Sequence, residues 1–166
     1  MNLIRHVEDQ CWDVLAQVSD PEIPVLSVLD LGMIRGVEIN PQDEIVVRLT
    51  PTYSGCPATD LLKAEITQAF AAHELTPVKV VVDLSEAWTT DWMSEEGKQK
   101  LQQYGIAPPK GKSNSCGTHV ALSDGIQCPH CHSHHTRLLS EFSSTACKAL
   151  YKCQECLEPF DYFKCI

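Results

Sequence analysis

Two Cys-x-x-Cys pairs are the residues whose types and spacing most directly indicate chemistry. Cys128 and Cys131 form the first pair, Cys153 and Cys156 the second, and 21 residues separate them. Each short turn can aim two thiolates at one point, and four thiolates complete the closed tetrahedral shell of a structural zinc site. The spacing predicts a zinc ribbon. An iron–sulfur cluster and a redox dithiol are the alternatives, since four thiolates also suit a cluster.

Other side chains near the two Cys-x-x-Cys pairs are weaker candidates for metal ligands. Four histidines crowd the first pair, and we expect them to be exposed because four cysteines already close the shell; they are His130, His132, His134 and His135. Cys147 is either a buried small hydrophobe or a substitute ligand. We assign no role to Cys116 or Cys165.

Cys56 is the second candidate site. It stands between Gly55 and Pro57, and we expect Pro57 to open a helix. The N–H groups and dipole at a helix N-terminus favour a thiolate, so Cys56 could bind a metal or a cluster. The alternative is a cysteine that only packs against strand ends, which is the common role of a free cysteine.

Hydroxyl and carboxylate groups on nearby loops could complete the ligand set around Cys56. Thr50 and Thr52 precede it on the same loop, and Asp20 and Glu22 lie on a proline-stiffened loop that could meet it. One thiolate with carboxylates and hydroxyls is an incomplete set of ligands. It suits a transient metal or cluster better than a permanent one.

The elements that position these residues follow from hydrophobic periodicity. We expect helices over residues 3–18, 57–70 and 88–104, strands over 33–39, 44–50 and 77–84, and ribbon strands at 138–142, 149–152 and 160–163. Asn40-Pro41-Gln42-Asp43 reads as a turn. The predicted class is α+β: a small three-helix, three-strand α/β domain over 1–106, a linker over 107–122 and a four-cysteine zinc ribbon over 123–166.

Composition and charge exclude several classes of protein. The chain has 166 residues and a formal charge of -9, of which residues 124–166 carry only -1. Such a charge repels nucleic-acid backbones. Charged residues near the N-terminus exclude a signal-peptide core, and no apolar run is long enough to cross a membrane, so we expect a cytoplasmic protein. Nine cysteines, an odd number, argue against a disulfide framework.

Three motifs give the first 84 residues a family resemblance. Asp20-Pro-Glu-Ile-Pro-Val, Asp30-Leu-Gly32 and Gly55-Cys-Pro57 together resemble the small iron–sulfur cluster assembly family with a DPE loop and a GCP turn. Beyond them, Trp88-Thr-Thr-Asp-Trp-Met93, Ser144-Thr-Ala-Cys-Lys-Ala149 and Glu158-Pro-Phe-Asp-Tyr-Phe-Lys164 resemble one branch, the D subunits of bacterial phenylacetyl-CoA oxygenase (epoxidase) systems. One departure is Ser143, where we expect glycine.

The resemblance implies an accessory role in aerobic phenylacetate degradation rather than catalysis by this chain alone. It implies that the chain matures or inserts an iron–sulfur or iron centre in a partner, which is an oxygenase or reductase subunit. The positions that it implies for a transient metal, cluster or partner site are Cys56, Asp20, Glu22, Thr50 and Thr52. Self-association stays open.

Two other functions compete with this one. A nucleic-acid-binding or regulatory zinc ribbon is disfavoured by the charge. A thiol enzyme with Cys56 as nucleophile needs a general base, usually a histidine. Outside the ribbon and linker the sequence offers only His6, on the first helix, and His73, nearly five turns beyond Cys56.

Overall fold

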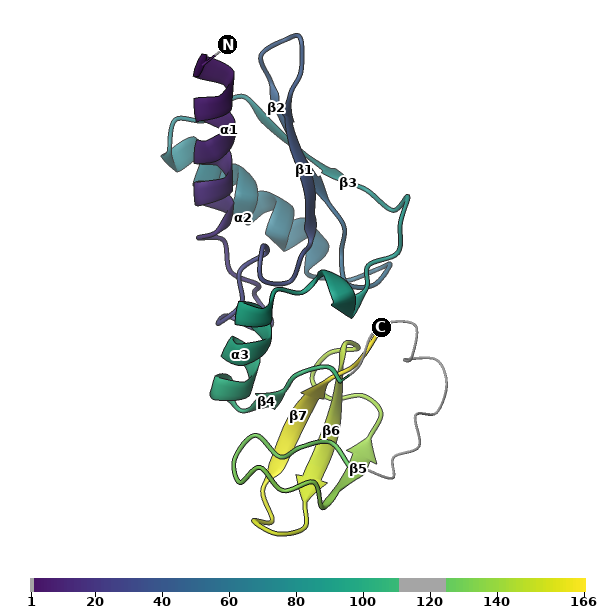
Figure 1. Ribbon diagram of the computed structural model, residues 1–166. Helices are drawn as coiled ribbons and strands as arrows, with labels where there is room; N and C mark the ends of the chain where they lie inside the picture. Colours follow the sequence, from purple (N-terminus) through teal and green to yellow (C-terminus); the bar gives the residue numbers. More distant parts are fainter. Residues whose placement is uncertain (1, 111–124) are drawn as a thin grey trace. The chain divides into compact units, whose positions relative to one another are not determined.

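The computed structural model describes residues 2–110 and 125–166 and has the α+β fold that the sequence predicts (Figure 1). It divides into two compact units, Met1–Trp88 and Thr89–Ile166. The predicted α/β domain extends to residue 106, whereas the third helix, α3 (Glu95–Tyr104), falls in the second unit. The reason is local, because α3 contacts strand β4 (Ile106–Ala107), which pairs with a ribbon strand.

The first unit is a three-stranded sheet with two helices on one face. After α1 (Asn2–Leu15), strands β1 (Ile34–Ile39) and β2 (Ile45–Leu49) form an antiparallel hairpin. Helix α2 (Thr59–Ala72) then crosses to β3 (Val78–Val82), which pairs in parallel with β2. The sheet order is β1-β2-β3, and α1 and α2 lie on the same side of it (Figure 1).

The alternation of buried and half-buried side chains along β2 shows which face of the sheet the helices cover. Ile45, Val47 and Leu49 are buried, whereas Val46 and Arg48 between them are half-buried. Helix α2 supplies the opposing apolar side chains, which have no exposed surface: Leu62, Ile66 and Phe70. Each such side chain contributes about 1.5–3 kcal/mol by leaving water. The helix-covered face is therefore the core, and the opposite face carries charged side chains.

Two turns of this unit are stabilised by their own side chains. Asn40 Oδ1 accepts hydrogen bonds from the N–H groups of Gln42 and Glu44, at 3.0 and 2.9 Å, in the turn that composition predicts. Asp30 Oδ2 accepts from both the N–H and the hydroxyl of Ser27. The second turn orders the segment between α1 and β1, whose apolar side chains join the core.

Helix α2 begins at Thr59, two residues later than the predicted start at Pro57. The Thr59 N–H donates to the Cys56 carbonyl at 3.1 Å, so residues 56–59 form a turn of their own before the helix. Ala58 is the N-cap and offers no side-chain oxygen to the first helical N–H groups. The prediction that Pro57 opens the helix, which would put Cys56 directly at its N-terminus, is therefore wrong.

The second unit is built on a four-stranded sheet in the order β4-β7-β6-β5. Strands β5 (Thr136–Ser140), β6 (Lys148–Cys153) and β7 (Pro159–Phe163) are antiparallel neighbours, as a ribbon requires, and β4 adds a parallel edge to β7. A 3₁₀ turn, η1 (Thr90–Trp92), precedes α3. Ser94 caps α3 through a hydrogen bond from Gly97 N–H at 2.8 Å, so the helix starts later than residue 88.

A small core holds the ribbon sheet together. Tyr151 stacks on Phe160 with ring centroids 6.0 Å apart, and Tyr162 meets Tyr151 edge-on at 5.6 Å. Beside them a buried ion pair joins Lys148 Nζ to Asp161 Oδ2 at 3.2 Å. The second carboxylate oxygen of Asp161 accepts a hydrogen bond from the Ser143 hydroxyl, at the position where the family resemblance favours glycine.

Part of the predicted linker lies outside the described residues. Of the range 107–122, Ala107 belongs to β4, and residues 111–124, Cys116 among them, are not described. Within the described ranges, no helix combines the length and apolar character that crossing a membrane requires.

Candidate metal centre and loop thiol

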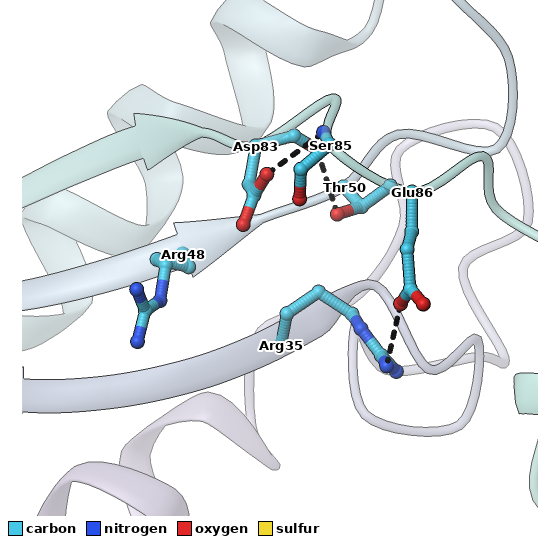
Figure 2. Close-up of a pocket in the computed structure, with 6 residues that line it drawn as sticks. All are labelled: Arg35, Arg48, Thr50, Asp83, Ser85 and Glu86. Atoms are coloured by element: carbon cyan, nitrogen blue, oxygen red, sulfur yellow. Dashed lines mark hydrogen bonds and ion pairs between the residues drawn. The ribbon is translucent and has the colours of Figure 1, made fainter.

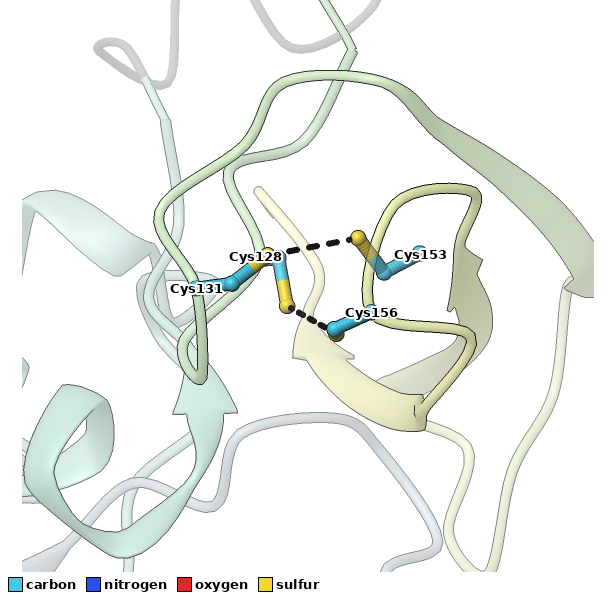
Figure 3. A group of neighbouring side chains, drawn as sticks. All are labelled: Cys128, Cys131, Cys153 and Cys156. Atoms are coloured by element: carbon cyan, nitrogen blue, oxygen red, sulfur yellow. Dashed lines mark hydrogen bonds between the residues drawn. The ribbon is translucent and has the colours of Figure 1, made fainter.

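The four ribbon cysteines converge on one point. The Sγ atoms of Cys128, Cys131, Cys153 and Cys156 all lie within 4.8 Å of one another (Figure 3). The Cys128–Cys156 separation is 3.7 Å and the Cys131–Cys153 separation is 3.5 Å. Sulfurs about 2.3 Å from a central zinc in a tetrahedron are about 3.8 Å apart. The separations fit a zinc shell and are far longer than the ~2.05 Å of a disulfide.

The two Cys-x-x-Cys turns have the same backbone design. The N–H of the first cysteine donates to the carbonyl five residues on, Cys128 to Ser133 at 2.9 Å and Cys153 to Glu158 at 3.0 Å. The residue after the second cysteine has a positive φ in both turns, 62° at His132 and 66° at Leu157. The repeated turn explains how separate segments present two sulfurs each to the same point.

The metal-free sulfurs titrate unequally. Burial raises the pKa of Cys153, but the N–H groups of Cys156 and Glu155 and the neighbouring thiols donate to its sulfur and lower the pKa to about 7. The Glu158 N–H lowers the pKa of Cys156, whereas burial and the three other sulfurs raise it to about 12. One thiolate thus forms near neutral pH, and a cation is needed to hold Cys156 deprotonated beside it.

The other candidates near the ribbon stay outside the sulfur shell. All four histidines are exposed. His135 Nδ1 lies 3.1 Å from Glu155 Oε1, and His134 Nδ1 lies 3.2 Å from the Gly125 carbonyl oxygen. Cys147 is buried, with its Sγ 3.0 Å from the Thr145 hydroxyl. Among the described residues, the convergent group consists of the four cysteines without His or Cys147.

Cys56 lies on the loop that joins β2 to α2. Its side chain is 8% exposed, whereas its neighbours Ser54, Gly55 and Pro57 are exposed. The Cys56 N–H donates to the Tyr53 carbonyl at 3.3 Å, and Gly55 has a φ of 84°. The thiol thus points inward from a loop whose backbone is at the surface.

The residues predicted to surround Cys56 have structural hydrogen bonds of their own. The Thr50 hydroxyl donates to the Asp83 carbonyl at 2.8 Å, tying the end of β2 to the segment after β3. Asp20 Oδ1 accepts from the N–H groups of Glu22 and Ile23, both at 2.8 Å. Asp20, Thr50 and Thr52 are buried, and Glu22 is half-buried.

These residues do not form a ready-made metal cage. Cys56, Asp20 and Glu22 are not a group with converging ligand atoms; in the described part of the chain only the ribbon cysteines are. A cluster or metal at Cys56 would need ligands from elsewhere. Their assignment as one transient site stays a prediction.

A polar pocket at the end of the first sheet was missed by the sequence reasoning. It has a cavity of about 200 Å³ lined by Arg35, Arg48, Thr50, Asp83, Ser85 and Glu86 (Figure 2). Hydrogen bonds from the Ser85 hydroxyl and N–H, with smaller contributions from Arg48 and Arg35, hold the pKa of Asp83 below its usual range. The signal in the sequence is two arginines on adjacent strands of an acidic segment.

Both halves of the chain match known families. Residues 8–82 match the family "Iron-sulfur cluster assembly protein", and residues 112–164 match "PaaD zinc beta ribbon domain". The fold of the first unit is also that of a domain of unknown function from Bacillus anthracis, with a TM-score of 0.55 and 23% identity over 60% of this chain and 94% of that one. The class is therefore an assembly-type α/β domain joined to a zinc ribbon.

Curated relatives identify the family more closely. The chain is 53% identical, over 95% of its length and 92% of the relative's, to the putative D subunit of the 1,2-phenylacetyl-CoA epoxidase of Escherichia coli K12. A second relative, "Fe-S protein maturation auxiliary factor" of Porphyromonas gingivalis, is 32% identical over 60% of this chain and 95% of its own length. The chain belongs to the family of phenylacetyl-CoA epoxidase D subunits, which confirms the resemblance seen in its motifs.

Proposed function

We propose that this chain is an accessory component of a phenylacetyl-CoA epoxidase system and that it matures an iron–sulfur or iron centre in a partner subunit. The observation that carries the proposal is the pairing of an assembly-type domain with end-to-end similarity to an epoxidase D subunit. The oxygenase and reductase subunits of that system are the proposed partners. The iron or cluster is the cargo, and the chain itself is not the oxygenase.

Cys56 is the proposed attachment point for that cargo. It is a free thiol on a loop with exposed neighbours, and Gly55 leaves open space where a Cβ would stand. A partner can therefore approach the loop backbone closely. Since Asp20 and Glu22 do not complete a ligand set with Cys56, the cargo would be bound weakly by this chain and passed on. Weak binding suits delivery better than storage.

The ribbon has a different role in the proposal. Cys128, Cys131, Cys153 and Cys156 are the proposed zinc ligands, and bound zinc supplies a structural cross-link between the two Cys-x-x-Cys turns. Four sulfurs leave no open position for substrate. The ribbon thereby stabilises the second unit, while the first unit carries out the maturation. The proposed compartment is the reducing cytoplasm, which keeps Cys11, Cys56 and the ribbon thiols reduced; Cys165, near the end of the chain, is disulfide-bonded.

A genetic experiment tests this function. The epoxidase subunits are produced together with the wild-type chain, with Cys56→Ser, or with Cys11→Ala, and iron and acid-labile sulfide are measured in the purified oxygenase and reductase. Cys11→Ala is the control because Cys11 is a free thiol of the same unit that is fully buried on α1. We expect one partner to lose most of its iron with Cys56→Ser only.

The opposite result would reject the proposal. Partners with a full iron content beside Cys56→Ser, at equal levels of soluble chain, would show that the loop thiol has no role in maturation. Zinc content of the variant is measured in parallel. It should equal the wild-type value, because the ribbon cysteines are untouched.

A further inference from the structure

Cations are scarce in the first unit and gather on one face of its sheet. Residues 1–88 contain 14 acidic and five basic side chains, a net charge of -9, whereas residues 89–166 contain eight of each. Four of the five basic side chains are described. Arg35, Arg48 and Lys79 lie on the sheet face opposite the helices, and Lys63 lies on α2.

Strand register and a bulge account for this placement. Arg48 alternates with the core residues of β2, and Lys79 of β3 is the register partner of Val46, so both point away from the helices. Arg35 is the extra residue of a β-bulge between Ile34 and Gly36, which turns its side chain toward the pocket. Gly36 has no side chain, and the Arg48 guanidinium lies over it, 3.5 Å from where a Cβ would be.

Two arginines and two hydroxyl side chains are among the residues that line the pocket. Arg35 and Arg48 come from neighbouring strands, and in Figure 2 the Arg35 guanidinium points toward Glu86. Arginine forks match carboxylates in a planar, two-point geometry. A volume of about 200 Å³ accommodates one side chain and is smaller than the pocket that a cofactor needs.

The carboxylates that now face the arginines are held loosely. Glu86 is 3.6 Å from Arg35 and its side chain is 72% exposed. Glu38 pairs with Arg48 and its side chain is 57% exposed. Exposed pairs of this kind contribute little to stability, because water screens the two charges. An incoming carboxylate can therefore replace either one without leaving an arginine unpaired.

We propose that this open sheet face, with the Arg35–Arg48 pocket at its end and Lys79 on its edge strand, is a docking surface that takes one acidic side chain, an Asp or Glu, of the partner that the chain matures. The inference rests on the proposed function and adds where the partner binds. Asp83 and Glu86 remain in the pocket and the unit is strongly acidic, so a polyphosphate or nucleic acid is repelled. A single carboxylate that exchanges with Glu86 is not.

Binding measurements with purified epoxidase components test the docking surface. The zinc-loaded chain is immobilised, and the oxygenase and reductase subunits are passed over it at low and moderate salt. Arg35→Gln/Arg48→Gln is the test variant, and Lys63→Gln is the matched control because Lys63 also pairs with an exposed carboxylate of its own unit. We expect the double variant to bind its partner at least tenfold more weakly, with a smaller salt dependence, and the control to bind as the wild type does.

Cross-linking identifies the chemistry of the partner. A zero-length carbodiimide joins lysine amines to carboxylates, so Lys79 should form cross-links with acidic residues of the bound partner, and Arg48→Lys should add a cross-link at position 48. Cross-links confined to Lys63, or equal binding by the double variant and the wild type, would overturn the docking surface. The iron content of the partner separates the maturation proposal from the docking proposal. Cys56→Ser should bind the partner normally and fail only to supply its iron. Absence of binding by the wild type together with normal partner iron would reject both.

Discussion

Cys56 and Cys11 are two free thiols of the first unit in different surroundings. Cys11 has no exposed surface, and burial together with the nearby Glu8 raises the pKa of its thiol. Cys56 keeps 8% of its surface on a loop with exposed neighbours. We expect iodoacetamide to modify Cys56 at least tenfold faster than Cys11 in the native protein, as mapped by peptide mass spectrometry. Equal, slow modification of both would place Cys56 in the closed core and contradict its proposed role.

Lys148 and Asp161 make a testable contribution to stability. The side chain of Lys148 is 6% exposed, so Asp161→Ala leaves a buried ammonium group without its carboxylate. Breaking a buried pair in this way costs on the order of 3 kcal/mol. We expect chemical denaturation of the zinc-loaded chain to show a loss of that size in the second unit. The control, Glu95→Ala, breaks the exposed Lys98–Glu95 pair and should change stability by less than about 1 kcal/mol.

At the scale of elements, the ribbon strands depend on the sulfur site. The described part of the ribbon is too small for a self-sufficient core, so metal binding must supply much of its folding free energy. We expect a strong chelator with reductant to abolish the near-ultraviolet signal of the Tyr151, Phe160 and Tyr162 cluster while the helices of the first unit persist. An unchanged aromatic signal after complete zinc removal would show that the strands hold without metal.

The pH dependence of zinc binding follows from the same sulfurs. The metal-free Cys153 has a pKa of about 7 and Cys156 one of about 12, so protons compete with zinc across the neutral range. Thiolates bind and thiols do not, so affinity is highest at high pH and falls as the pH falls. Competition with a chromophoric chelator should show a loss of at least roughly a hundredfold per pH unit, because Cys128 and Cys156 each give up a proton when zinc binds. A flat profile would mean that zinc binding displaces no proton and that these thiols are not its ligands.

The elements that sequence reasoning predicts well are those set by neighbouring residues. The Asn40 turn follows from an amide side chain that bonds its own backbone, and the sulfur site follows from the spacing of Cys128 with Cys131 and of Cys153 with Cys156. Strand β4 was missed because its pairing partner, Asp161–Tyr162, lies more than fifty residues away. Long-range pairing of two residues leaves no periodic signal.

In the candidate sites, too, the features set by neighbouring residues could be predicted and those set by tertiary packing could not. The Gly55-Cys-Pro57 motif is enough to single out Cys56 as a candidate site. Its distance from the start of α2 depends on the turn over residues 56–59, which the sequence pattern does not predict. The Arg35–Arg48 pocket depends on a one-residue bulge in β1, and a bulge reverses which face a side chain takes. Burial of Cys56 is likewise a tertiary property, set by how the loop packs on the core.

On the scale of the whole molecule, the two units differ in charge and in the metal chemistry proposed for them. The first carries a net charge of -9 and one loop thiol proposed to hold cargo, whereas the second is neutral and holds four sulfurs in one closed shell. A closed shell retains its metal, and an incomplete ligand set releases it. One chain would therefore bind metal in two ways, and the two can be measured separately.

Anaerobic reconstitution with iron and sulfide tests these two kinds of binding most directly. Zinc, iron and acid-labile sulfide are measured per chain in the wild type and in Cys56→Ser, with Cys11→Ala as control. We expect equal zinc in all three proteins, and iron with sulfide in the wild type and control but not in Cys56→Ser. Equal iron and sulfide in Cys56→Ser and the wild type would show that Cys56 does not hold the cargo.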